Sequence, residues 1–117
     1  MKTIFVYGSL KSGKSKNFYL TRSDSKLLGA TKTAPNYKLV QQWFQNYPSM
    51  VEDEKGVSID GELWQVSDET LSDLDDIEGV ARGLFKRVPI KLYNGSEVEA
   101  YLAVNKPFPY WNAGSKW

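Results

Sequence analysis

The sequence predicts an α+β fold: a small mixed, largely antiparallel and barrel-like sheet of about six strands, with one main helix. Three observations carry this prediction. Short apolar segments alternate along the chain with turn-forming residues, as the strands of an antiparallel sheet do. A single stretch, residues 68–78, has extended helical spacing. Asn94-Gly95 separates two apolar segments and is a strong signal for a β-hairpin.

The expected strands are short and are bounded by glycine, proline or polar residues. They span residues 3–7, 27–30, 37–44, 59–66, 87–93 and 97–104. Gly61, inside the fourth of them, is expected to mark a bulge or a point of close backbone approach. Residues 8–13 and 48–56 are expected to form loops, and residues 17–20 to begin a short helix.

Polar residues and a glycine define the ends of the main helix. Ser67 is a favourable N-cap, and Asp68 and Glu69 place negative charge where the helix dipole is positive. Gly79 is expected at the C′ position, because glycine readily adopts the left-handed conformation that ends a helix. The helix is therefore expected over residues 68–78.

Length and composition limit the possible functions. A chain of 117 residues with 41% hydrophobic residues buries enough surface for one domain, expected to span residues 1–117. Its 15 basic and 14 acidic residues give a formal charge of +1, so we expect no nucleic-acid partner and no membrane partner. No apolar segment approaches the ~20 residues of a membrane span, and Met1-Lys2 leads into a strand without a signal-peptide pattern. A cytoplasmic protein is therefore expected.

The chain contains neither cysteine nor histidine. Without cysteine there is no disulfide, no thiolate nucleophile and no thiolate metal site. Without histidine, the usual general base and the commonest transition-metal ligand are missing as well. Any acid–base catalyst in this protein must therefore be a carboxylate, a lysine or a tyrosine.

Glu78 is the carboxylate that the helix pattern singles out. At about 100° per residue, Leu71, Leu74 and Glu78 fall on one helix face, with Asp75 at its edge. An inward carboxylate at a helix C-terminus has a raised pKa, because desolvation and the negative end of the dipole both disfavour its anion. Such a group can act as a general base near neutral pH. Asp75 is the weaker candidate for a direct role.

A structural role for Glu78 fits the same pattern. Its carboxylate can pair with Arg82 or Arg87, or it can accept a backbone hydrogen bond where the helix ends. Helical geometry alone favours neither interpretation. The general base and the structural partner therefore both remain open at this point.

Residues 8–15 also have two interpretations. Gly8-Ser9-Leu10-Lys11-Ser12-Gly13-Lys14-Ser15 matches the Walker A pattern and follows a strand, which predicts phosphate binding with Lys14 as counter-charge and Ser15 on Mg²⁺. However, the helix that follows is short, one main helix is too few for a parallel α/β sheet, and no apolar strand ends in a metal-binding aspartate. A P-loop nucleotide binder is therefore the remote alternative to a glycine-containing turn with solvated lysines.

The N-terminal motif resembles the V-Y-G-[ST]-L opening of the γ-glutamylcyclotransferase-like, or AIG2-like, proteins, in particular the γ-glutamylamine cyclotransferase type. Here it reads Val6-Tyr7-Gly8-Ser9-Leu10-Lys11, with Gly13 and residues 17–20 behind it. Five further segments resemble the family in the same order: Tyr47-Pro48-Ser49-Met50-Val51, Gly61-Glu62-Leu63-Trp64-Gln65-Val66, Leu74-Asp75-Asp76-Ile77-Glu78-Gly79, Phe85-Lys86-Arg87-Val88 and Ala113-Gly114-Ser115-Lys116-Trp117. Phe85 departs from the tyrosine that is frequent in the family.

The resemblance implies a small barrel-like α+β fold with a cavity, and a cyclotransferase activity. In the family's reaction, the α-amine of a γ-glutamyl group attacks its own γ-carbonyl, which yields 5-oxoproline and a released amine. The resemblance aligns the family's catalytic acid with Glu78 and its substrate-binding loop with Tyr7, Gly8, Ser9 and Leu10. It implies no metal and no organic cofactor, and a small-molecule γ-glutamyl amine or γ-glutamyl amino acid as the partner.

Elementary chemistry agrees with that implied reaction. The attacking ammonium must first lose a proton, which Glu78 can accept and later return to the departing amine. Backbone N–H groups of Gly8, Ser9 or Leu10 can stabilise the oxyanion. Ser9 is not expected to be a nucleophile, because the chain has no histidine to activate it. A non-catalytic small-molecule binding module of the same fold is the alternative, since the family includes members without demonstrated activity.

Overall fold

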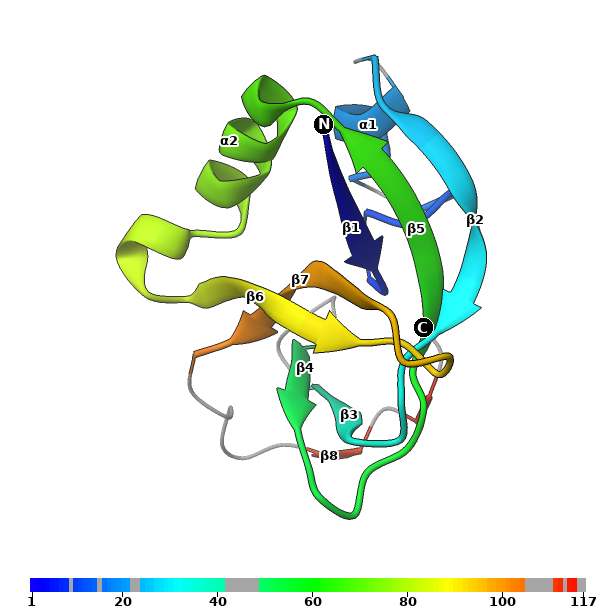
Figure 1. Ribbon diagram of the computed structural model, residues 1–117. Coiled ribbons are helices and arrows are strands. Elements are labelled where there is room, and N and C mark those ends of the chain that lie inside the picture. Colours follow the sequence, from blue (N-terminus) through cyan, green and yellow to red (C-terminus); the bar gives the residue numbers. More distant parts are fainter. Residues whose placement is uncertain are drawn as a thin grey trace.

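The computed structural model describes residues 1–8, 10–14, 16–21, 24–41, 49–104, 111–112 and 114–115 (Figure 1). In chain order the described elements are β1 (Lys2–Val6), α1 (Phe18–Thr21), β2 (Lys26–Lys32), β3 (Tyr37–Gln41), β4 (Ser49–Glu52), β5 (Asp60–Val66), α2 (Asp68–Ile77), the 3₁₀ helix η1 (Val80–Arg82), β6 (Phe85–Lys91), β7 (Glu97–Ala103) and β8 (Trp111–Asn112). None of the described helices is long and apolar enough to cross a membrane.

The described strands form two sheets. The larger sheet has the order β2-β5-β1-β7-β6, and the smaller sheet has the order β4-β3-β8. All described strand pairs are antiparallel except β1 with β7, which run parallel. The predicted α+β class with a mixed, largely antiparallel sheet is thereby confirmed.

The larger sheet does not close into a barrel within the described part of the chain. Its edge strands β2 and β6 meet only at their C-terminal ends, where Thr33 bridges Leu92. There the Ala34 N–H donates to the Lys91 carbonyl oxygen (2.9 Å). Elsewhere the two edges remain apart, and α2 is inserted into the connection between β5 and β6 (Figure 1). The expected barrel is therefore an open sheet whose edges touch at one end.

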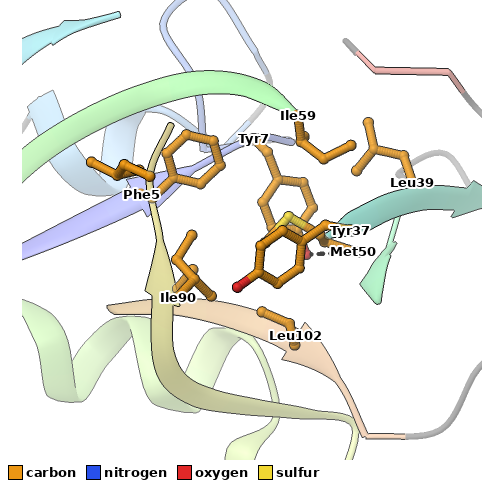
Figure 2. Packing of buried hydrophobic residues seen from close by; sticks show 10 residues of the cluster. Phe5, Tyr7, Tyr37, Leu39, Met50, Ile59, Ile90 and Leu102 are labelled. Carbon is orange, nitrogen blue, oxygen red and sulfur yellow. Dashed lines mark hydrogen bonds between the residues drawn. The ribbon is translucent and has the colours of Figure 1, made fainter. Parts of the chain in front are cut away.

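Strand β1 is covered on both faces, because its side chains alternate between two apolar clusters. Ile4 and Val6 pack with residues of α1 and α2. Phe5 and Tyr7 point the other way, into a cluster between the two sheets (Figure 2). That second cluster contains Phe5, Tyr7, Tyr37, Leu39, Met50, Ile59, Ile90, Leu92, Ala100 and Leu102. The predicted buried strand at residues 3–7 is thus confirmed as β1, shifted by one residue.

The Tyr7 hydroxyl joins the two sheets. It donates to the Tyr101 carbonyl oxygen of β7 (2.7 Å) and accepts from the Met50 N–H of β4 (3.1 Å). Figure 2 shows the bond to Met50 within the cluster. Burial raises the pKa of the Tyr7 hydroxyl, so the phenol stays protonated and keeps its donor. The side chain thereby satisfies two backbone groups that cannot reach water.

Three local signals in the sequence act as predicted. The Ser67 Oγ accepts from the Thr70 N–H (3.2 Å) at the start of α2. Gly79 has a φ of 70° immediately after the C-cap residue Glu78, so the helix ends within one residue of the expected position. The predicted hairpin is formed by β6 and β7, and in the turn between them Gly95 has a φ of 86° and its N–H donates to the Leu92 carbonyl oxygen (2.9 Å).

The prediction of a loop over residues 48–56 is wrong in part, because β4 occupies its first half. Met50 pairs with Leu39 of β3, and the side chains of Ser49, Met50 and Val51 are all buried. A four-residue strand buried on both sides has no alternation that would distinguish it from an apolar turn. Residues 42–48, which include the predicted end of the previous strand, lie outside the described part of the chain.

Gly61 is a point of close backbone approach, one of the two options that the sequence left open. A Cβ atom there would collide with the Val6 carbonyl oxygen and the Phe5 ring. The irregularity in pairing lies instead in the neighbouring strand β2, whose register against β5 shifts between Leu27 and Gly29. Glycine at position 61 is therefore needed so that β5 can pack directly against β1.

We expect Tyr7→Phe to lower the free energy of unfolding by about 1–3 kcal/mol, because the buried Met50 N–H loses its acceptor. The matched control is Tyr93→Phe, which removes the hydroxyl of a tyrosine that is 60% exposed. Its effect should stay below about 0.5 kcal/mol. Urea unfolding of both variants measures the difference, and equal losses would contradict a bridging role for the Tyr7 hydroxyl.

Candidate active site

A pocket lies where the end of β1 and the loop after it face the C-terminal end of α2. Its volume is about 70 Å³, enough for a few water molecules or for the compact head of a small ligand. The lining residues are Phe5, Val6, Tyr7, Gly8, Leu10, Lys16, Ile77, Glu78, Leu84, Phe85 and Tyr101. Four residues predicted from the sequence thus line one pocket, namely Tyr7, Gly8, Leu10 and Glu78. Ser9 lies outside the described residues.

Glu78 is held at the pocket by the end of α2. Leu71 and Leu74 bury the apolar face of the helix in the core, which turns the same face toward β1. The Glu78 N–H donates to the Leu74 carbonyl oxygen (2.9 Å), and Glu78 is the C-cap residue of the helix. The left-handed turn at Gly79 then directs the chain away toward η1. The Glu78 side chain is therefore presented at the last helical position.

The Glu78 carboxylate makes no hydrogen bond and no ion pair with the residues that the structure describes. Its surroundings are largely apolar, so desolvation raises its pKa above the ordinary value. The positive charge of Lys16, which also lines the pocket, partly offsets this rise. Of the two interpretations of Glu78, the described contacts contradict the pairing with Arg82 or Arg87.

The loop after β1 is fixed by hydrogen bonds within the chain. The Lys11 N–H donates to the Gly8 carbonyl oxygen (3.0 Å), which closes a tight turn. The Asn17 Nδ2 donates to the Leu10 carbonyl oxygen (2.8 Å). Among described residues, the N–H groups of Gly8 and Leu10 have no acceptor. These two donors are available to a ligand.

The contacts of the same loop argue against the Walker A interpretation. A P-loop directs its N–H groups at phosphate, whereas here the N–H and hydroxyl of Ser12 both donate to Glu62 Oε1 (2.8 and 3.2 Å). The Lys14 N–H donates to the Lys11 carbonyl oxygen (3.0 Å). Helix α1 has 4 residues and begins only at Phe18, so within the described part of the chain it does not start at Lys14 as the helix of a P-loop would. The negatively charged Glu62 carboxylate thus lies beside the loop where a nucleotide phosphate would need positive charge.

Tyr7 contributes to the pocket differently from what the sequence suggests. Its hydroxyl is engaged on both sides by Tyr101 and Met50 in the core and is not available to a ligand. Tyr7 therefore forms part of the pocket wall and holds the start of the loop. Ligand-binding polar groups must come from its neighbours.

Arg87 fastens the last turn of α2 to the sheet behind the pocket. Its Nε and Nη2 donate to the two carboxylate oxygens of Asp75 (2.9 and 3.2 Å), and its Nη1 donates to both oxygens of Glu99 (3.1 Å each). The Tyr101 hydroxyl donates to Asp75 Oδ1 (2.6 Å). Burial, followed by the bond to Asp75, raises the pKa of Tyr101 and keeps it a donor. Asp75 therefore holds the helix three residues before Glu78.

Sequence reasoning assigned no site role to Lys16, Leu84, Phe85 or Tyr101, all of which line the pocket. Phe85 lies in a segment with a family-like pattern, and Tyr101 lies in a predicted strand. For both residues, the sequence therefore contained a pattern that indicated their position. Lys16 had none, because a lysine in a polar loop is ordinarily solvated. Its position in the pocket depends on the turns that fold the loop back toward α2.

We expect Arg87→Met to lower the free energy of unfolding by about 1–3 kcal/mol, because Asp75 and Glu99 lose their shared partner. Lys86→Met is the matched control, since it removes a neighbouring exposed charge on the same strand. Chemical unfolding at neutral pH compares the two variants. A similar small effect of both would show that the clamp does not stabilise the helix end.

We expect the stability of Glu78→Gln relative to the original protein to depend on pH. Because the folded state raises the Glu78 pKa, the acid stabilises the fold below its unfolded pKa, and this contribution is lost as the pH rises through the folded value. Glutamine resembles the protonated acid at every pH. Compared with the original protein, the variant should therefore have a similar melting temperature at about pH 4 and a higher one at about pH 8. A lower melting temperature near pH 8 would indicate an anion stabilised by a partner.

Comparisons with known proteins are consistent with this fold. A protein of Methanocaldococcus jannaschii, provisionally named a gamma-glutamylcyclotransferase, is 38% identical over 104 residues, which cover 87% of this chain and 82% of the relative. The crystal structure of a uropathogenic E. coli-specific protein has the same fold, with a TM-score of 0.85 at 23% identity over 99% of this chain and 91% of the other.

An AIG2-like protein of Mus musculus is similar as well, with a TM-score of 0.77 at 25% identity over 92% of this chain and 80% of the other. A family model described as gamma-glutamyl cyclotransferase, AIG2-like, matches residues 4–116. The match therefore extends from β1 to beyond β8 and includes every described element that forms the pocket. This chain belongs to the gamma-glutamyl cyclotransferase, AIG2-like family.

Proposed function

We propose that this protein is a cyclotransferase that converts a γ-glutamyl amine or γ-glutamyl amino acid into 5-oxoproline and the free amine. The observation that carries the proposal is a carboxylate, Glu78, without a described partner in a largely apolar pocket that also receives the loop after β1. Membership of the family supports the reaction class. Among the described residues that line the pocket, Glu78 is the one carboxylate.

Glu78 is assigned as the general base and then the general acid. Its carboxylate takes a proton from the α-ammonium of the substrate, and the freed nitrogen attacks the γ-carbonyl carbon of the same molecule. The tetrahedral intermediate collapses by breaking the bond between the γ-carbon and the departing nitrogen, which receives the proton from Glu78. The second proton of the ring nitrogen passes to the released amine, which leaves as an ammonium. Desolvation supports both steps, because a carboxylate whose pKa is raised is a stronger base than an ordinary one and can return the proton that it accepts.

The loop of Tyr7, Gly8, Ser9 and Leu10 is assigned to binding the glutamyl group and the oxyanion. The available N–H groups of Gly8 and Leu10 support this role, because an oxyanion requires donors that are not engaged elsewhere. Each such donor is worth roughly 3–4 kcal/mol of transition-state stabilisation in other acyl-transfer enzymes. The Asn17 side chain and the Lys11 N–H already fix the carbonyl groups of this loop, so its donors are preorganised.

The test is a panel of γ-glutamyl amines and γ-glutamyl amino acids, assayed for 5-oxoproline release. Glu78→Gln should lower kcat/KM by ~10²–10⁴-fold, because it keeps the volume of the side chain but cannot accept a proton. The matched control is Asp76→Asn, which neutralises an exposed carboxylate on the same helix and should keep its activity.

Binding separates the possible failures. Calorimetry should show that Glu78→Gln still binds the substrate that it no longer converts. Activity of Glu78→Gln near that of the original protein would remove Glu78 as the base. Binding of γ-glutamyl compounds without any 5-oxoproline from the original protein would overturn the enzyme and identify a non-catalytic binding module.

A further inference from the structure

The pocket is too small to enclose a whole substrate of the proposed kind. Its volume of about 70 Å³ suits the compact head of a ligand, so the rest of the molecule must leave through the mouth of the pocket. In the proposed reaction the head is the γ-glutamyl group, and the part outside is the substituent on the departing nitrogen. The residues at the mouth therefore contact this substituent, and their chemistry decides which amines are released.

Leu84 lies at the mouth of the pocket, because it lines the pocket although the residue is 53% exposed. The Leu84 N–H donates to the Gly79 carbonyl oxygen (3.1 Å), which folds residues 79–84 back onto the end of α2. A Cβ atom at Gly79 would lie only 2.8 Å from Leu84 Cδ1, so the leucine side chain rests on the glycine that follows Glu78. Leu84 is thus held beside the residue that is proposed to protonate the departing nitrogen.

Val104 extends the apolar surface of Leu84 away from the pocket. The Val104 N–H donates to the Leu84 carbonyl oxygen (3.2 Å), which continues the antiparallel pairing of β6 with β7 by one residue. Residues that lie directly opposite each other in such a pair have Cβ atoms roughly 5 Å apart. Val104 is exposed as well. Exposed apolar residues are common singly, but these two continue a pocket wall that already includes Ile77 and Phe85.

We propose that Leu84 and Val104 determine specificity for the leaving amine, and that the preferred substrate is the γ-glutamyl amide of a primary amine with an uncharged alkyl chain of several carbons. This inference rests on the proposed function and narrows its substrate class. The alkyl chain begins at the nitrogen that Glu78 protonates, lies over Leu84 and then reaches Val104. Each methylene group that these side chains cover is removed from water, which favours binding.

Arg82 belongs to the same turn and offers a competing interpretation, in which the amine carries an anionic tail. Its Nη2 would lie 3.1 Å from a Cβ atom at Gly79. However, Arg82 is exposed and is not among the described residues that line the pocket. A carboxylate on the amine would lose hydration against Leu84, whereas its attraction to an exposed guanidinium is weak in water. The apolar tail is therefore the favoured occupant, and the experiment tests the anionic one directly.

The experiment measures 5-oxoproline release from the γ-glutamyl amides of methylamine, n-propylamine, n-butylamine and n-hexylamine. These amines have nearly the same basicity, so the series changes the tail and leaves the reacting groups alike. In the original protein kcat/KM should rise roughly 2- to 4-fold for each methylene group that becomes covered, through a lower KM. A series without this rise would overturn the inference and leave the proposed function intact.

Two variants of the mouth and one matched control locate the effect. Leu84→Ala should remove most of the rise along the series, because it deletes the surface next to the departing nitrogen. Val104→Thr keeps the shape of the side chain and should reduce the gain only for the longer chains. Leu28→Ala is the control, since Leu28 is an equally exposed leucine of β2 outside the pocket, and the series should be unchanged. The same rise in the original protein and in both mouth variants would contradict contact with Leu84 and Val104.

A charged tail provides the second comparison. The γ-glutamyl amide of n-hexylamine should exceed that of 6-aminohexanoate by roughly 10-fold or more in kcat/KM, because the carboxylate must remain hydrated. A preference for the carboxylate that disappears in Arg82→Met would overturn the inference and assign the tail to Arg82.

Failure of the proposed function gives a different result. If the original protein releases no 5-oxoproline from any of these compounds, the cyclotransferase proposal fails, and calorimetric binding of the same series becomes the readout. Affinity that rises with chain length, and rises less in Leu84→Ala but not in Leu28→Ala, still supports an apolar mouth. Equal affinity along the series overturns it.

Discussion

The burial of β1 on both faces is the constraint on which the rest of the structure depends. Its neighbours in the sheet, β5 and β7, leave it no edge, and its alternate side chains enter two separate clusters. Every residue from Ile4 to Tyr7 is therefore fixed by packing. The chain emerges from this rigid strand directly into the pocket at Gly8. A loop whose N–H donors are held in fixed positions needs such a rigid support, because a loop alone has too few buried contacts to fix them.

The two walls of the pocket are fastened from outside by charged side chains. On one side, Glu62 of β5 accepts from the N–H of Ser12 and holds the loop. On the other, Arg87 and Asp75 hold the end of α2. These ion pairs and charge-assisted hydrogen bonds hold the loop and the end of α2 in place, and none of them involves Glu78. The residue proposed to carry the chemistry is thus relieved of a structural role within the described fold.

Local signals were sufficient for much of the fold, because Ser67, Gly79 and Asn94-Gly95 each act within a few residues of their own position. Signals that depend on distant partners were not sufficient. The parallel pairing of β1 with β7 and the short strand β4 are decided by packing between sheets. The helical face placed Glu78 correctly toward the core. The pairing of Arg87 with Asp75 could not be predicted in the same way, because it depends on where β6 lies. The place of Lys16 in the pocket could not be predicted either, because it depends on how the loop folds.

The pocket is assembled from the first strand, the end of α2 and the seventh strand, which includes Tyr101. An occupant therefore touches segments close to both ends of the described chain at once. By mass action, a ligand at about 100 times its dissociation constant adds about 2.7 kcal/mol to the stability of whatever cooperative unit it holds together. That unit here includes the central strand itself. Occupancy should consequently register as a rise in the melting temperature of the whole protein, so compound libraries can be screened by heat before any turnover is sought.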